Sequence, residues 1–213
     1  NFAEVFAVLI VSLFLWRYDF LTSTQLLWIN LITDSLPVLA LGVERTDGVM
    51  NRPPVSEKEI FSGSSLFRML FFGVAQTAVI VGLFLYGVHA WGNAVASTVA
   101  FLTMSLLELF HAFNVRNEEG RTRLRDYVSN KTLLLTVAVG IIVNVLLVVV
   151  PPLRYALGLA DLNAMQWLAV GLASLSILPI GELFKACYLR MQRKNSIPIK
   201  RRKKHIPLSE TRR

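Results

Sequence analysis

Asn30-Leu-Ile-Thr33-Asp34-Ser-Leu-Pro37 is a string of oxygen-bearing side chains and a proline inside the apolar stretch from Leu26 to Gly42. Polar and ionisable groups at membrane depth are costly, and they usually mark an ion or substrate pathway. In a regular helix, positions i, i+3 and i+4 share one face, so Asn30, Thr33 and Asp34 would point the same way. Pro37 has no N–H, which leaves the carbonyl of Thr33 without its helical partner and free to act as a further ligand. The stretch therefore predicts half of a cation site.

The composition predicts an integral membrane protein. Of the 213 residues, 54% are hydrophobic, whereas ordinary soluble domains reach about 45–50% even with glycine counted. A membrane-spanning helix needs about 20 apolar residues; the first apolar stretch is cut short, so we expect a fragment of a longer protein. We predict an all-α fold, a polytopic membrane helical bundle with six transmembrane helices. The expected spans are about 1–16, 24–43, 66–88, 95–113, 133–150 and 166–184, within a transmembrane domain of residues 1–189 that precedes a basic tail, 190–213.

The positive charge of the chain is distributed unevenly. The formal net charge is +8, and of the 22 Lys and Arg residues only Arg17 and Arg154 fall in the loops 17–23, 89–94 and 151–165. Because positive residues concentrate on the cytoplasmic side of membrane proteins, we expect loops 44–65 and 114–132 and the tail to be cytoplasmic, in a multi-pass protein of the plasma membrane. The basic run at 200–204 fits contact with anionic lipid. The expected partner is therefore the lipid bilayer, and not nucleic acid.

Three acidic residues on three different spans fall at about the same depth. Glu4 precedes the outer turn by about 20 Å of helix, and Asp34 and Glu108 lie about ten and thirteen residues into their own spans. No Lys or Arg is expected in the inner part of any span, so a cation or protons must neutralise these charges. Calcium prefers six to eight oxygen ligands, whereas copper and zinc select sulfur and imidazole groups that this set lacks. The predicted cation-binding side chains are those of Asn1, Glu4, Asn30, Thr33, Asp34 and Glu108.

Other polar residues within the spans have structural explanations. Glu182 stands one turn before Lys185 near the end of the last span, so we expect a local ion pair there. Gln76 and Asn144 are expected to form hydrogen bonds between helices, because such bonds commonly join membrane helices. None of these residues is needed for the predicted cation site.

The residues around the predicted site resemble a known family. Leu27-Trp-Ile-Asn-Leu-Ile-Thr-Asp-Ser-Leu-Pro37, followed by Ala40-Leu-Gly-Val-Glu44, resembles the sixth transmembrane helix of the calcium-pump branch of the P-type ATPases, of the sarcoplasmic reticulum type. Asn1-Phe-Ala-Glu4 is similar to the ligand pair of the fifth helix in that family, and Glu108 to a ligand of its eighth. The resemblance runs from the fifth to the tenth helix. The short loop at 89–94, where animal pumps have a long one, favours a bacterial form.

The resemblance implies a role for each matching residue. Asn1, Glu4, Thr33, Asp34 and Glu108 would build one calcium site, with Asp34 bridging to a second site that uses Asn30. Phosphorylation of an aspartate by ATP would drive alternating access to these sites, and protons would return in exchange for calcium. The family's phosphorylation sequence, Asp-Lys-Thr-Gly, does not occur in this chain. ATP and magnesium would therefore bind to cytoplasmic domains that, with helices one to four, precede this part, and the fragment would be inactive alone.

Two other functions stay open on the sequence alone. A passive cation channel, or a secondary cation/proton transporter, could use the same acidic cluster without ATP. Alternatively, the chain could mainly support other helices, since its later spans carry few buried charges. A dependence of calcium uptake on ATP separates the first of these functions from a pump.

Overall fold

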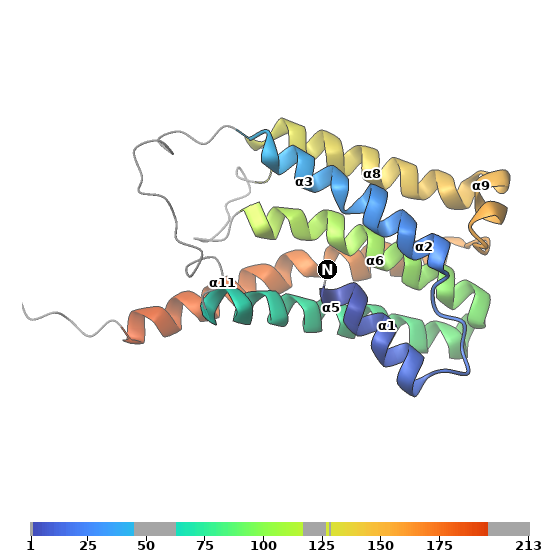
Figure 1. Cartoon of the computed structure of the whole chain (residues 1–213), viewed down its shortest axis with the longest axis horizontal. Helices are drawn as coiled ribbons and strands as arrows, with labels where there is room; N and C mark the ends of the chain where they lie inside the picture. The colour runs from blue at the N-terminus through green and yellow to red at the C-terminus, as the bar shows by residue number, and fades with distance from the viewer. Residues whose placement is uncertain (1, 45–62, 117–126, 128, 196–213) are drawn as a thin grey trace, which may run out of the picture.

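The computed structural model describes residues 2–44, 63–116, 127 and 129–195, and within these ranges the chain is a bundle of helices without strands (Figure 1). The predictions that concern Asn1, most of the two loops expected to be cytoplasmic, and the basic run at 200–204 lie outside the described residues. The helices are α1 (Phe2–Phe14), α2 (Ser23–Trp28), η1 (Ile29–Thr33), α3 (Ser35–Gly42), α5 (Gly63–Trp91), α6 (Asn93–Arg116), α8 (Lys131–Val149), α9 (Pro151–Ala156), α10 (Ala164–Leu175) and α11 (Ile177–Asn195).

The predicted all-α membrane bundle is confirmed. Five helical segments of the described chain are long and apolar enough to cross a membrane, and α1 is a sixth, shorter apolar helix. The five long segments are Ser23–Gly42, Gly63–Trp91, Asn93–Arg116, Lys131–Val149 and Ala164–Tyr188. Each of them contains or overlaps one of the stretches expected from the sequence.

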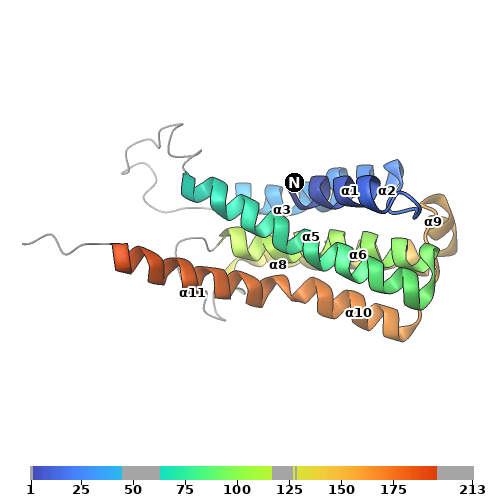
Figure 2. The ribbon, with the colours of Figure 1, turned by 90° about the horizontal axis from the view of Figure 1, so that it is seen from below.

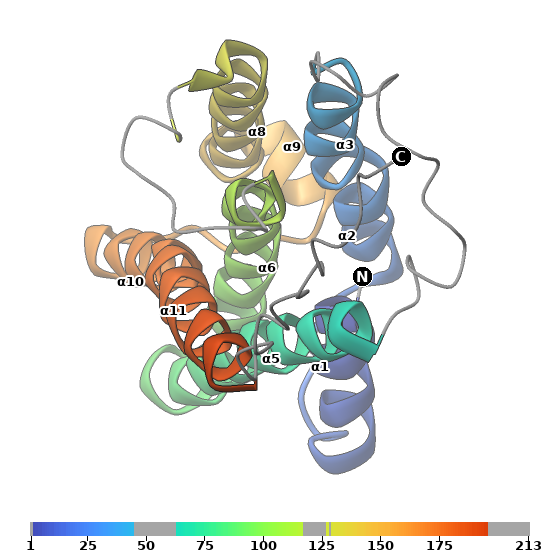
Figure 3. The same ribbon diagram turned by 90° about the vertical axis from the view of Figure 1, so that its left-hand side faces the viewer.

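Helix α6 is the centre of the bundle, with the other helices around it in the end-on view (Figure 3). In its most apolar stretch 67% of the residues are buried, against 28% to 33% in the other four long segments. Small side chains permit this close packing: Ala96 of α6 lies so near Gly87 of α5 that a methyl group on Gly87 would approach the Ala96 Cβ to 3.0 Å. The two helices are joined by Gly92 alone, whose φ of +87° suits glycine.

The short connections α1–α2, α5–α6 and α9–α10 all lie at one end of the bundle (Figure 1). The last residues of α3 and α6 and the first residues of α5 and α8 lie at the opposite end. This alternation is the one expected of consecutive spans. Pro151 ends the segment Lys131–Val149, because Val150 before it is extended, and a new short helix, α9, starts at the proline.

Helices α10 and α11 run end to end along one edge of the bundle (Figure 2). The break between them falls at Ser176, whose backbone N–H is shared between the carbonyls of Leu172 and Ala173. Pro179 explains this break, since it cannot donate to the carbonyl of Leu175 four residues earlier. The last span is therefore broken a few residues before this proline.

Two polar residues of the later spans have partners close in sequence. Lys185 lies near the end of the last span, three residues before Tyr188, and is only 6% exposed. The predicted ion pair explains how Lys185 is buried there, because its Nζ lies 3.1 Å from Oε1 of Glu182. Asn144 was expected to bond to another helix, but its amide donates to the carbonyl of Gly140 in its own helix, at 2.8 Å.

Helix α1 is held mainly by α5, which it covers over only part of its length (Figure 2). The hydroxyl of Thr77 on α5 donates to the carbonyls of Gly73, at 2.7 Å, and Ala3, at 3.2 Å. The backbones approach closely at Gly73, where an added Cβ would lie 2.7 Å from the Cβ of Phe2. Since Glu4 follows Phe2 by two residues, this contact positions the first acidic side chain of the predicted site.

We expect Gly73→Ala to destabilise the bundle by about 1–3 kcal/mol. The new methyl group would lie 2.7 Å from the Cβ of Phe2, so α1 or α5 must move. Gly82→Ala is a matched control on the same helix, since no atom lies within 4 Å of its added Cβ. The control should be neutral or slightly stabilising, because alanine favours helix by about 1 kcal/mol over glycine. Thermal unfolding in detergent measures both variants. Equal stability of the two variants would contradict the α1–α5 contact.

Candidate cation-binding site

The predicted site segment is not a regular α-helix. Residues Ile29–Thr33 form a π-helical turn, in which the N–H of Asp34 donates to the carbonyl of Ile29 five residues earlier, at 3.0 Å. Such turns occur mostly as single insertions in α-helices, frequently at functional sites. The wider turn separates side chains that a regular helix would align: Asn30 is exposed on the described chain, Thr33 is fully buried, and Asp34 is intermediate. The ligand role predicted for the Thr33 carbonyl stays a prediction.

A hydrogen bond joins the two helices that carry the predicted ligands. The side-chain amide of Asn30 donates to Oε1 of Glu4 at 2.7 Å, and also to the carbonyl of Leu26 at 3.0 Å. Glu4 is 9% exposed. This bond links α1 to η1 and orients the carboxylate of Glu4 toward the π-helical turn, so the structure brings together the predicted ligands Glu4 and Asn30.

Thr33 and Asp34, the other two predicted ligands of the site segment, follow Asn30 at the end of the π-helical turn. Asp34 lies near enough to Glu4 for the two negative charges to repel each other. The hydroxyl of Thr33 is buried and has no hydrogen-bond partner among the described residues. An unpaired buried hydroxyl is costly, and a bound cation would offset that cost by accepting its oxygen as a ligand.

Within the described ranges, Glu108 does not form a cluster with Glu4 and Asp34. It is half-buried on α6, the helix that η1 contacts, but no set of three His, Cys, Asp or Glu side chains in the described ranges is clustered closely enough to hold a metal ion. Asn1 lies outside those ranges. The roles predicted for Asn1 and Glu108 therefore stay predictions.

The outer end of the site segment is fixed by a buried glutamine. Gln25 forms a capping box with Thr22, in which each side chain accepts a hydrogen bond from the backbone N–H of the other residue, at 3.0 and 3.2 Å. The Gln25 amide also donates to the carbonyl of Leu157, just after α9, at 2.9 Å. This bond fixes the start of the site segment against the turn between α9 and α10. Asn30 follows Gln25 by only five residues.

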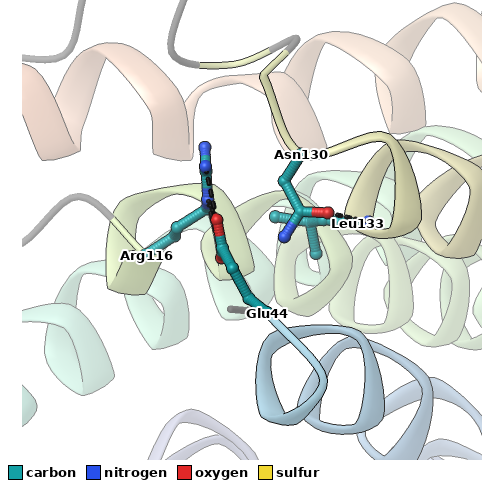
Figure 4. A network of polar contacts seen from close by, with 4 residues as sticks. All are labelled: Glu44, Arg116, Asn130 and Leu133. Atoms are coloured by element: carbon teal, nitrogen blue, oxygen red, sulfur yellow. Dashed lines mark hydrogen bonds and ion pairs between the residues drawn. The ribbon is translucent and has the colours of Figure 1, made fainter. Parts of the chain in front are cut away.

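The opposite end of the site segment is fixed by an ion pair that the sequence did not suggest (Figure 4). Arg116, at the end of α6, donates from Nε to both carboxylate oxygens of Glu44, at 2.9 and 3.0 Å, and from Nη2 to Oε1 at 2.6 Å. Asn130, whose Oδ1 caps α8 by accepting from the N–H of Leu133 at 2.9 Å, lies beside the same carboxylate. Because 72 residues separate Glu44 from Arg116, no local spacing could have revealed the pair.

The surroundings of Glu44 lower the pKa of its carboxyl below the ordinary value of 4.5. The main cause is hydrogen bonding from Arg116; burial opposes this effect, and the nearby amide of Asn130 lowers the pKa further. Glu44 is therefore ionised at neutral pH and stays so under moderately acidic conditions. Glu44 and Arg116 lie at the starts of the segments 44–65 and 114–132. Their pairing therefore brings the starts of these two segments together.

The comparison with protein families matches residues 19–187, most of the chain, to the C-terminal region of cation-transporting ATPases. The chain belongs to the cation-transporting ATPases. The family expected from the sequence around Asn30 is thereby confirmed. The site segment, α2 to α3, falls wholly within the matched range.

Individual relatives of this ATPase chain come from bacteria and plants. It is 30% identical over 204 residues to calcium-transporting ATPase 1 of Bacillus cereus, covering 87% of this chain and 23% of the relative. It is 34% identical over 173 residues to calcium-transporting ATPase 12, plasma membrane-type, of Arabidopsis thaliana, covering 78% and 16%. A calcium-transporting ATPase of Bacillus subtilis is 29% identical over 154 residues, covering 70% and 17%. The chain therefore spans between 16% and 23% of the length of these relatives.

We expect the contribution of Glu44 to the stability of this ATPase chain to depend on pH. A carboxyl with a lowered pKa stabilises the fold above its ordinary pKa, and this stabilisation is lost as the pH falls through the lowered value. Glu44→Gln should therefore reduce the free energy of unfolding by about 1–2 kcal/mol at pH 7. The difference from wild type should shrink below pH 4.5. Unfolding in detergent at a series of pH values measures this; a difference that stays constant down to pH 3 would contradict the pairing.

Proposed function

We propose that this chain is the cation-binding membrane part of an ATP-driven calcium transporter. The observation that carries this proposal is the hydrogen bond between Glu4 of α1 and Asn30 of η1, with the carboxylate of Asp34 close by. Two acidic side chains and the amide side chain of Asn30 lie near one another there, within an apolar bundle. Charges of one sign in such a place need a cation or protons to neutralise them.

The chemistry of the donors favours calcium. Glu4, Asn30, Thr33 and Asp34 offer only oxygen atoms, which suit a hard cation with a flexible coordination shell. The Thr33 hydroxyl, buried without a partner among the described residues, is available as one of them. The names of the Bacillus and Arabidopsis relatives, all calcium-transporting ATPases, support the same ion.

The remaining ligands and the driving reaction belong to other parts of the protein in this proposal. Asn1 and Glu108 complete the coordination, and further ligands come from a helix outside this chain on the open side of Asn30. ATP and magnesium bind in cytoplasmic domains, where an aspartate is phosphorylated, and that event changes access to the site. When calcium leaves, protons take its place on the carboxylates and are carried back.

The membrane orientation is also part of the proposal. Residues 1–189 form the transmembrane domain in the plasma membrane, and the end of the bundle that carries Glu44 and Arg116 faces the cytoplasm. The segments 44–65 and 114–132 and the basic tail 190–213 lie on that side. The concentration of Lys and Arg in those segments supports this orientation.

We expect Asp34→Asn to lower the calcium affinity of transport by more than about tenfold, as loss of groups at metal sites typically does. The measurement is ATP-driven uptake of calcium into vesicles that contain the complete gene product. Asp161→Asn is the control, because Asp161 is a largely exposed aspartate whose ion pair with Arg154, at 2.8 Å, lies in the connection at the far end of the bundle. The control should transport like wild type.

Three results would overturn the proposal. Uptake that continues after ATP is removed would favour the passive channel or the secondary transporter. Full calcium-coupled turnover of Asp34→Asn would exclude this segment as the cation site. A gene whose upstream sequence lacks a phosphorylation motif would exclude the ATP-driven mechanism.

A further inference from the structure

We propose that Glu44 and Arg116 form a positioning pair, with Asn130 beside it. This pair sets the calcium affinity of the site by fixing the C-terminal end of the site segment. The inference rests on the proposed function and adds residues that do not touch the cation. Its basis is that Arg116 at the end of α6 binds the carboxylate of Glu44, which follows α3, while Asn130 at the start of α8 lies beside that carboxylate (Figure 4). Nothing else in the described chain holds the end of α3 by charge.

The geometry of the pair is that of a fixed contact and not of a loose surface ion pair. Nε and Nη2 of Arg116 contact both carboxylate oxygens of Glu44, and a two-pronged contact defines orientation as well as distance. The side chains are 15% and 28% exposed, so water screens them only in part. The amide nitrogen of Asn130 is buried, has no hydrogen-bond partner among the described residues, and faces the same carboxylate. A small approach of α8 would add a third donor to Glu44.

The pair can act on the cation site because a short, stiff element joins them. From Asp34 to Glu44 the chain rises about 15 Å as helix. Helix α3 contains Pro37 and Ala40, both buried, and it packs along α8 and α6. A displacement of Glu44 is therefore transmitted to the π-helical turn, where Thr33 and Asp34 lie.

The site segment, from α2 to α3, is fixed at both ends and has an irregular backbone in the middle. Gln25 bonds to Leu157 at the outer end, and Glu44 bonds to Arg116 at the other. Between them, the π-helical turn of Ile29–Thr33 is the part whose hydrogen bonds can rearrange at least cost. With one end released, the turn can relax toward a regular helix, which would rotate Asn30 away from Glu4 and weaken the site.

The test measures calcium-dependent ATP hydrolysis by the complete gene product, and reports separately the calcium concentration for half-maximal rate and the maximal rate. Arg116→Gln and Glu44→Gln should each raise that calcium concentration by about fivefold or more, a typical coupling between two sites, with the maximal rate changed less than twofold. The exchange of the two residues, Glu44→Arg with Arg116→Glu, should restore much of the affinity. Asp161→Asn, which removes an ion pair outside the α3–α6–α8 contact, is the matched control and should behave like wild type.

Thermal unfolding of the same four variants, and of the double variant Glu44→Gln with Arg116→Gln, separates positioning from mere stability. Coupling between Glu44 and Arg116 in a double-mutant cycle of unfolding, together with an unchanged calcium dependence, would overturn the positioning role and leave a structural pair. A wild-type protein whose ATP hydrolysis does not respond to calcium would overturn the proposed function, and this inference with it. A raised calcium requirement that the exchanged pair does not lower would also overturn the inference, because the effect would then not come from the pair.

Discussion

A carboxylate among membrane helices must be hydrogen-bonded or neutralised, because leaving it bare costs several kcal/mol. In this chain Asn30 meets part of that requirement by donating to Glu4 across the gap between η1 and α1. The bond needs Asn30 to turn toward α1, and the π-helical turn provides the extra residue that allows it. Asp34, whose charge repels that of Glu4, forms no ion pair within the described ranges. The two helices are therefore joined by a hydrogen bond, while the negative charges of Glu4 and Asp34 repel each other.

The rest of the bundle explains how such a group can be held in place. Helix α6 is the most buried of the long helices, and the site segment packs against it along η1 and α3. Helix α1 rests instead on α5, through the close approach at Gly73. The Glu4–Asn30 bond thus joins α1, which rests on α5, to the site segment, which rests on α6 and α8.

Much of this fold could be predicted from the sequence, because apolar length and loop charge are local signals. The spans, the end of α8 before Pro151, the bend before Pro179 and the Glu182–Lys185 pair all follow from residues within a few positions of each other. The family could also be inferred from the spacing around Asn30 and Pro37. Three features could not. The π-helical turn depends on how backbone hydrogen bonds divide between i−4 and i−5, and the Glu44–Arg116 pair joins residues far apart in sequence. The burial of Lys185 depends on the neighbouring helices.

Thr33 offers the most direct test that this group of residues holds the cation. Its hydroxyl is buried and has no hydrogen-bond partner among the described residues, so replacing it with the methyl group of valine removes an oxygen while keeping the shape. If the hydroxyl is a ligand, equilibrium binding of radioactive calcium to Thr33→Val should weaken by about tenfold, while thermal stability without calcium is unchanged or higher, since no hydrogen bond is lost. Calcium binding equal to that of wild type would contradict the account.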